Sequence, residues 1–188
     1  MVEGVILAGG KSSRMKENKM MKIYLDQPLI YHAVNAMLDI CDFVTIVTGH
    51  YDEDYLRLFD HDVRIKLVFN PNYENGMFSS VQAGVSSINN DVFIIPGDYP
   101  LVKAETYKKM LLEIGELRVP KYKEKKGHPI FISKQLLKDL KNEPIESNLK
   151  VFRDRYKVNY IDVDDPGVLI DIDNIEDYSQ LVETGGLV

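Results

Sequence analysis

Cysteine is almost absent from the sequence, since Cys41 is the single example among 188 residues. One thiol cannot build a disulfide framework within the chain, and it cannot supply a cysteine-based zinc site. A lone cysteine is more often a small buried hydrophobic side chain than a nucleophile. We therefore assign Cys41 to the core and expect a reducing compartment, the cytoplasm.

Long hydrophobic runs are also missing from the sequence. No stretch approaches the roughly 20 apolar residues that a membrane-spanning helix needs. The opening segment, MVEGVILAGG, lacks the basic residues and the apolar run of a signal peptide. We therefore expect neither a membrane partner nor an export signal.

Positive charge is in deficit, because 23 Lys and Arg residues face 29 Asp and Glu residues and the net charge is −6. This balance argues against nucleic acid as the main partner, because proteins that bind nucleic acids usually present a basic face. It is compatible with a small polyanionic ligand, since a local cationic pocket can form on an acidic protein.

The first part of the chain alternates two kinds of segment. Short apolar runs predict strands at 2–8, 22–26, 43–48, 65–69 and 91–98. Helical spacing of apolar residues predicts helices at 29–38, 52–59, 79–88 and 105–114. Strands that alternate with helices imply crossover connections and a mainly parallel sheet, which defines an α/β fold. Ligands of such sheets bind beyond the carboxyl ends of the strands.

The second part of the chain is less regular. A hairpin with a lysine-rich tip is predicted at 118–133, helices at 133–140, 147–155 and 174–182, and strands at 158–163 and 167–173. The sequence contains no internal repeat, no low-complexity run and no linker. We therefore expect a single domain over residues 1–188, with the hairpin as a small lobe.

The segment LAGGKSSRMKENK, residues 7–19, follows the first predicted strand and combines adjacent glycines with a group of cations. Gly9 and Gly10 let the backbone pass close to a phosphate or a base. Arg14 can bind phosphate oxygens through two N–H groups, and Lys19 adds a compact charge. The spacing matches neither the dinucleotide-binding nor the phosphate-loop motif. The segment is thus a candidate triphosphate site, and the alternative is a polar loop with solvated cations.

Several segments resemble one family. LAGGKSSRM with the later Lys19 resembles the signature of nucleotidyltransferases that couple a nucleoside triphosphate to a phosphorylated acceptor. NPNYENGMFSSVQAGV, IIPGDYPLV, KKGHPIFIS and LIDIDNIEDYSQL follow in the order of the molybdenum-cofactor cytidylyltransferases and guanylyltransferases. Lys16 stands where the signature usually has glycine. The resemblance covers nearly the whole chain and implies a Rossmann-like, three-layer nucleotidyltransferase fold.

The resemblance implies a role for each residue of the glycine-containing loop. Leu7, Ala8, Gly9 and Gly10 would bind the nucleotide, and Arg14 and Lys19 would stabilise charge on the reacting phosphates.

Two acidic residues far apart in the sequence are candidate Mg²⁺ ligands. Asp98 ends a predicted strand, where a carboxylate that faces a triphosphate is a natural ligand, and it also counts as a catalytic residue. By resemblance, Asp173 completes the metal site, with Asp171 as a neighbour or a helix cap. The alternatives are that Asp98 is an ordinary turn residue and that Asp173 caps the last helix.

Two further segments are assigned by resemblance. Gly76 and Ser80 would hydrogen-bond the base edge, and Gly84 would allow close helix packing. The alternative is that a serine of this segment, Ser79 or Ser80, caps a helix. His128, in the Gly-His-Pro segment, would contact the acceptor, and the alternative is an exposed histidine without a function.

The function implied by the resemblance is transfer of a nucleoside monophosphate from CTP or GTP to the phosphate of molybdopterin, with release of pyrophosphate. The LAGG opening resembles guanylyltransferases, whereas the middle and Gly-His-Pro segments resemble cytidylyltransferases, so the base stays open. A molybdoenzyme or a chaperone is an implied protein partner. The alternatives are a nucleotidyltransferase for a sugar or polyol phosphate and a non-catalytic nucleotide-binding accessory protein.

Overall fold

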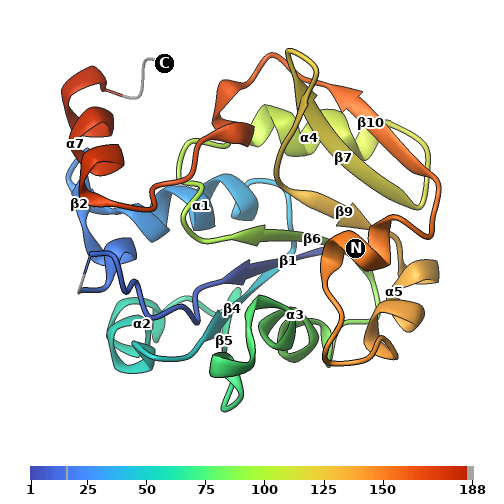
Figure 1. The fold of residues 1–188 in the computed structure, drawn as a ribbon, viewed down its shortest axis with the longest axis horizontal. Helices are drawn as coiled ribbons and strands as arrows, with labels where there is room; N and C mark the ends of the chain where they lie inside the picture. The colour runs from blue at the N-terminus through green and yellow to red at the C-terminus, as the bar shows by residue number, and fades with distance from the viewer. Residues whose placement is uncertain (16, 186–188) are drawn as a thin grey trace.

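The computed structural model describes residues 1–15 and 17–185, and Lys16 lies outside the described residues. A central, mainly parallel sheet is covered by helices on both faces (Figure 1). This arrangement confirms the expected three-layer α/β fold.

The central sheet has eight strands over the described residues, in the order β10-β7-β9-β6-β1-β4-β5, with β8 paired to β7. Their bounds are β1 Val2–Leu7, β4 Phe43–Thr48, β5 Ile65–Phe69, β6 Asp91–Pro96, β7 Leu117–Tyr122, β8 Lys125–Lys126, β9 Ile130–Ile132 and β10 Val158–Asp162. Strands β6, β1, β4 and β5 pair in parallel, and β9 is antiparallel to both β6 and β7. A separate two-stranded ladder joins β2 (Ile23–Tyr24) to β3 (Gln27–Pro28).

The helices connect these strands as the periodicity predicts. Their bounds are α1 Leu29–Leu38, α2 Asp52–Phe59, α3 Met77–Val85, α4 Ala104–Leu112, α5 Lys134–Lys141, α6 Leu149–Arg153 and α7 Ile175–Thr184. Three short 3₁₀ helices are also described, η1 Lys19–Met21, η2 Tyr73–Asn75 and η3 Pro166–Leu169. Among the described helices, none has both the length and the apolar character that are needed to cross a membrane.

Each face of the sheet has its own apolar core, because successive side chains of a strand point to opposite faces. On β1, Val5 and Leu7 join the core beneath α3 and α5, whereas Ile6 joins the core beneath α1 and α4. A strand that is buried on both faces is typical of a parallel sheet, and this explains the continuous apolar run VIL.

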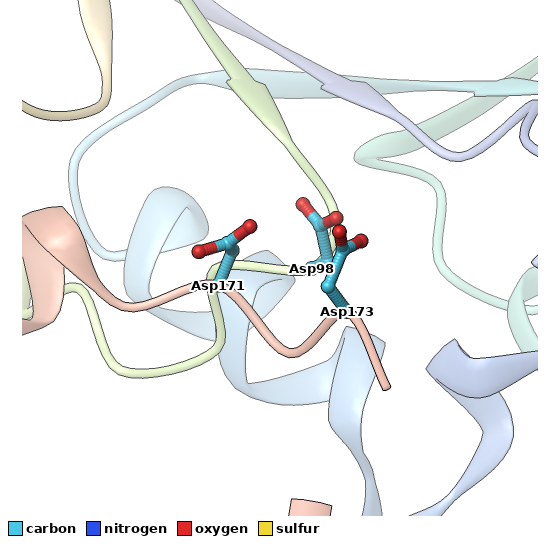
Figure 2. A group of neighbouring side chains, drawn as sticks. All are labelled: Asp98, Asp171 and Asp173. Carbon is cyan, nitrogen blue, oxygen red and sulfur yellow. The ribbon is translucent and has the colours of Figure 1, made fainter. Parts of the chain in front are cut away.

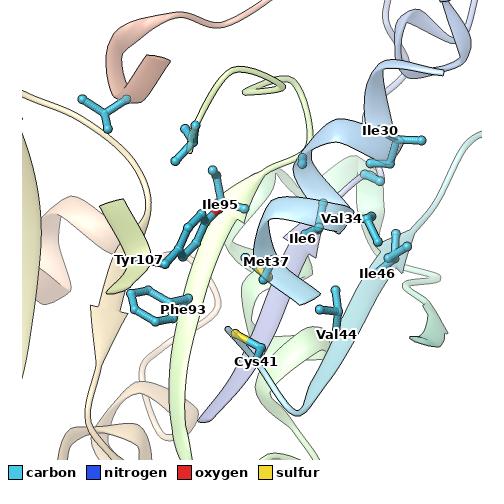
Figure 3. Packing of buried hydrophobic residues seen from close by; sticks show 14 of the residues in the cluster. Ile6, Ile30, Val34, Met37, Cys41, Val44, Ile46, Phe93, Ile95 and Tyr107 are labelled. Carbon is cyan, nitrogen blue, oxygen red and sulfur yellow. The ribbon is translucent and has the colours of Figure 1, made fainter. Parts of the chain in front are cut away.

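Cys41 lies in the core beneath α1, close to Met37 and Val44 (Figure 3). Its side chain is buried, and burial raises the pKa of the thiol to about 12. The thiol is therefore protonated at neutral pH, as a structural cysteine should be.

The hairpin predicted at 118–133 is formed by β7, β8 and β9, and its longer strands continue into the central sheet. Its tip turns at Lys123 and Glu124, which adopt the left-handed conformation with φ of 44° and 68°. A two-residue turn with both φ values positive suits the twist of antiparallel strands.

The prediction of a strand at residues 167–173 is wrong. Residues 166–169 form η3, and the Asp165 side chain accepts a hydrogen bond from the Gly167 N–H. The following residues run extended without a strand partner, and the Ile172 N–H donates to the Asp98 carbonyl instead. The apolar pattern of this segment therefore reflects burial of Val168 and Ile172 against neighbouring elements and not membership of the sheet.

Replacement of Gly84 by alanine is expected to destabilise the fold by about 1–3 kcal/mol. The new Cβ would lie 2.6 Å from Val5 Cγ1 and 2.7 Å from Val47 Cγ2, so α3 would have to move away from the sheet. The β-branched valines cannot turn aside easily. Urea denaturation measures the free energy of unfolding. Gly10→Ala is the control, because its Cβ would meet nothing within 4 Å, and equal stability of the two variants would refute the close-packing interpretation.

Candidate active site

A cavity of about 430 Å³ lies at the carboxyl edge of the sheet. Nine of the predicted site residues line it, namely Leu7, Gly9, Gly10, Arg14, Lys19, Gly76, Ser80, Asp98 and Asp173. Two predicted residues, Ala8 and His128, are not among the lining residues. Residues that are separated by up to 166 positions in the chain, from Leu7 to Asp173, therefore meet in one place.

The glycine-containing loop is held to the sheet through its backbone. The Gly97 N–H donates to the Leu7 carbonyl, and the Ala8 N–H donates to the Val47 carbonyl. The Ala8 side chain is buried in the core beneath α1, because it continues the strand alternation. Any contact of Ala8 with a ligand would therefore have to come from its backbone.

Lys19 is positioned by the residue before it. The Asn18 side chain caps η1 by accepting a hydrogen bond from the Met20 N–H, and it also accepts one from the Tyr55 hydroxyl at 3.2 Å. The Asn18 amide group donates to Asp54 at 3.0 Å. Because Asn18 is tied to α2 in this way, the buried Lys19 side chain leaves η1 in one direction, toward the acidic residues.

The acidic residues come from two loops that are tied together by the backbone. Asp98 follows β6 through Gly97, and the Ile172 N–H donates to the Asp98 carbonyl at 2.9 Å. Carboxylate oxygens of Asp98, Asp171 and Asp173 lie within 4.8 Å of one another. Figure 2 shows Asp98 and Asp173 side by side, with Asp171 next to them on the same segment as Asp173.

Asp173 does not cap α7. The cap is Asn174, whose side chain accepts from the Asp177 N–H, while the Asp177 carboxylate accepts from the N–H groups of Asn174 and Asp173. This capping box fixes the Asp173 backbone. The alternative role of Asp173 as a helix cap is therefore wrong, and its carboxylate is left to face the cavity.

The ammonium group of Lys19 lies between the two carboxylates. Its Nζ is 2.7 Å from Asp98 Oδ2 and 2.8 Å from Asp173 Oδ1, and Arg14 forms a further ion pair with Asp173. Burial alone would lower the pKa of Lys19, but the carboxylates of Asp98 and Asp173 raise it. The hydrogen bond from Lys19 lowers the pKa of Asp173, so both groups are charged at neutral pH.

Two parts of the acidic cluster have no hydrogen bond or ion pair with Lys19 or Arg14: the Oδ1 atom of Asp98 and the carboxyl group of Asp171. Asp98 Oδ1 is buried and has no hydrogen-bond partner among the described residues. Burial and the negative charges of Asp98 and Asp173 raise the pKa of Asp171. Both features indicate that the acidic side of the cavity can accept more positive charge than Lys19 and Arg14 provide.

The middle segment enters the cavity at the start of α3. Gly76 is the N-cap residue with φ of 95°, a conformation that favours glycine. Ser79 and Ser80 lie inside the first turns, so neither serine caps the helix, contrary to the alternative considered from the sequence.

Sequence reasoning missed three residues of this region. Tyr73 and Met77 line the cavity, and the buried Asn70 donates hydrogen bonds to both serines. Asn70 directly follows β5, so its position at the carboxyl end of a parallel strand was the signal that could have identified it.

His128 is partly buried and packs edge-on against Tyr99, with 4.8 Å between the ring centroids. Its Nδ1 atom is buried without a hydrogen-bond partner among the described residues. Burial lowers the pKa of His128 to about 4. The alternative of an exposed histidine is therefore wrong, although the residue also lies outside the cavity lining.

The family model described as the MobA-like NTP transferase domain matches residues 4–159. The molybdenum cofactor cytidylyltransferase of Escherichia coli is 26% identical over 183 residues, which cover 94% of this chain and 93% of that protein. A probable molybdenum cofactor guanylyltransferase of Flavobacterium johnsoniae is 27% identical over 78% of this chain and 76% of that protein.

Solved structures support the fold. A crystal structure of Rv0371c from Mycobacterium tuberculosis superposes with a TM-score of 0.83 at 22% identity and covers 97% of each chain. A complex of Rv0371c with manganese superposes with a TM-score of 0.80 at 20% identity and covers 97% of this chain and 98% of that chain. At these identities the likeness concerns the fold alone.

His128 is expected to remain neutral until the pH falls to about 4, because burial disfavours the charged form of its ring more strongly than the Asp171 charge favours it. The unfolded chain takes up the same proton near pH 6.5. The folded state therefore loses stability as the pH falls from about 6.5 to about 4. Titration of the His128 ring signals by NMR measures the pKa directly. A midpoint near 6.5 in the folded protein would contradict the burial of the ring.

Proposed function

The chain belongs to the MobA-like NTP transferase domain family, and from this membership we propose that it transfers a nucleoside monophosphate from CTP or GTP to the phosphate of molybdopterin. Pyrophosphate is the second product. The relatives that are named molybdenum cofactor cytidylyltransferase and guanylyltransferase support the choice of acceptor. The observation that carries the proposal is the meeting of Lys19, Asp98 and Asp173 beside the glycine-containing loop in one cavity.

The reaction that we propose is an in-line displacement at phosphorus. A phosphate oxygen of the acceptor attacks the α-phosphorus of the nucleotide, and the bond to pyrophosphate breaks. A phosphomonoester is mostly a dianion near neutral pH, since its second pKa is about 6. The attacking oxygen therefore needs no general base, and the main barrier is repulsion between anions.

The cations of the cavity reduce this repulsion. Arg14 can bind two phosphate oxygens through its planar guanidinium group, and Lys19 adds a charge at one point. Both side chains also pair with carboxylates of the cavity. Each side chain has N–H donors that these carboxylates leave unused, and through them it would bind phosphate oxygens and stabilise the charge that develops during transfer.

The acidic residues fit a hard divalent cation, for which we propose Mg²⁺. The donors are carboxylate oxygens, and the buried Oδ1 of Asp98, which has no hydrogen-bond partner among the described residues, provides a ligand atom. Asp98 and Asp173 would hold the cation, with Asp171 beside them. When bound, the cation would neutralise negative charge on the phosphates. The manganese complex of Rv0371c supports a divalent cation in this fold.

We propose CTP as the first choice of nucleotide. The cytidylyltransferase relative matches almost the whole length of both proteins, whereas the guanylyltransferase relative matches about three quarters. Gly76 and Ser80 line the cavity and would contact the base. A molybdoenzyme or its chaperone would receive the product.

The decisive experiment measures pyrophosphate release with CTP or GTP, Mg²⁺ and molybdopterin. We expect release that depends on molybdopterin, and a decrease in kcat by about 10³-fold or more in Asp98→Asn, since the metal loses its main carboxylate ligand. Asp162→Asn is the control, because Asp162 is an exposed carboxylate on β10 outside the cavity lining. Its turnover should match the wild type.

Three outcomes would contradict parts of this proposal. Release with a sugar phosphate or a polyol phosphate, but not with molybdopterin, would replace the acceptor. Nucleotide binding without turnover on any acceptor would favour the accessory function. Full Mg²⁺-dependent turnover of Asp98→Asn would remove the metal assignment.

Lys19→Met is expected to bind Mn²⁺ at least about tenfold more tightly than the wild type when no nucleotide is present. The Lys19 ammonium lies between Asp98 and Asp173 and therefore competes with the metal for both carboxylates. The same variant should lose turnover, because the Lys19 ammonium group no longer stabilises the charge on the reacting phosphates. Electron paramagnetic resonance of free Mn²⁺ measures the affinity. Equal Mn²⁺ affinities of variant and wild type would exclude this competition.

A further inference from the structure

A buried amide behind the cavity, Asn70, has no role in the reaction described so far. We propose that Asn70 is a positioning residue that fixes the Ser80 hydroxyl as a hydrogen-bond donor toward an acceptor atom of the nucleobase. The inference rests on the proposed function, because it concerns how the same cavity recognises its nucleotide.

The orientation of the Asn70 amide is determined by the backbone. Asn70 is 2% exposed, and its Oδ1 accepts a hydrogen bond from the Asn72 N–H at 3.0 Å. Its own backbone N–H donates to the Thr48 carbonyl at 3.1 Å. Because Oδ1 faces an N–H group, the NH₂ group must face the other side, where only donation is open to it.

The two hydrogens of this NH₂ group are directed at two neighbouring serines. Nδ2 lies 2.9 Å from Ser79 Oγ and 3.0 Å from Ser80 Oγ. Both hydroxyls therefore accept from Asn70, and each keeps one hydrogen to donate. The Ser79 hydroxyl has acceptors for this hydrogen within the protein, because the carbonyls of Asn72 and Gly76 lie 2.9 and 2.8 Å from its Oγ.

The Ser80 hydroxyl differs from that of Ser79 in two ways. Among the described residues, no acceptor is found for its hydrogen. Ser80 also lines the cavity, and an added Cβ on Gly9 would lie 3.2 Å from Ser80 Oγ. The bare backbone of Gly9 therefore leaves space for a ligand atom next to this hydroxyl.

These contacts favour one role of the Ser80 hydroxyl toward a ligand, that of a donor. Asn70 occupies one lone pair of its oxygen, and among the described residues its hydrogen has no acceptor. A carbonyl oxygen or an unprotonated ring nitrogen of a base satisfies it, whereas an exocyclic amino group does not. A base that presents only an amino group there would reach the second lone pair and leave the buried hydroxyl hydrogen without an acceptor, and this penalty creates selectivity.

The test compares two probes, the nucleoside triphosphate that the wild type binds better and inorganic tripolyphosphate, each titrated with Mg²⁺ in a calorimeter. The readout is the ratio of the two affinities, because Ser80 should affect the base and not the phosphates. In Asn70→Ala and in Ser80→Ala this ratio should fall about 3- to 10-fold, as expected for the loss of one hydrogen bond. The double variant should equal Ser80→Ala, because Asn70 acts through Ser80.

Ser79→Ala is the matched control, since Ser79 shares the amide of Asn70 but does not line the cavity. Its affinity ratio should equal that of the wild type. If Asn70→Ala does not fold, Asn70→Asp replaces it, because a carboxylate has the same shape but cannot donate a hydrogen bond to Ser80. The added negative charge weakens the binding of both probes through their phosphates, and this effect cancels in the affinity ratio.

If Asn70 has only a structural role, Asn70→Ala should reduce the affinity for both probes equally, or the double variant should have a lower affinity ratio than Ser80→Ala. Either result overturns the inference. An unchanged ratio in Asn70→Ala, with tight nucleotide binding by the wild type, also overturns it while the proposed function stands. Failure of the wild type to bind any nucleoside triphosphate would instead count against the proposed function itself.

Discussion

The contact on which the site depends is that of the Lys19 ammonium with the carboxylates of Asp98 and Asp173. The three residues belong to a 3₁₀ helix after the first strand, a turn after β6 and a loop before α7. Each is fixed by its own local structure, so the charges meet without further adjustment. Lys19 follows the capping residue Asn18, Asp98 is bonded through its carbonyl to Ile172, and Asp173 precedes a capping box.

This ion pair also explains how an acidic protein can bind a polyphosphate. The net charge of the chain is −6, yet Arg14 and Lys19 hold two positive charges at the cavity. Without ligand, these cations neutralise the acidic residues, whose mutual repulsion would otherwise destabilise the fold. Under the proposed function, a nucleotide that arrives with a divalent cation would offer both groups new partners of opposite charge. The same residues can therefore stabilise the empty protein and the loaded one.

Most of the fold could be predicted because its signals are local. The apolar run of β1 and the helical spacing of α1 depend only on neighbouring residues, and both elements were predicted close to their observed bounds. The segment 167–173 shows the limit of this reasoning. Its residues Val168 and Ile172 are buried although the segment joins no strand, and burial in an irregular segment has the same composition as burial in a strand.

The sequence by itself determined the chemistry that is available at the carboxyl edge of the sheet: a glycine-containing loop with cations, and acidic residues after a strand and before the last helix. Only the tertiary structure decided which atoms face the cavity. It turns Ala8 into the core, buries the His128 ring beside Tyr99 and places Asn70 behind Ser80. The reason is physical: residue type and spacing report local conformation and charge, whereas the direction of a side chain depends on distant residues that pack against it.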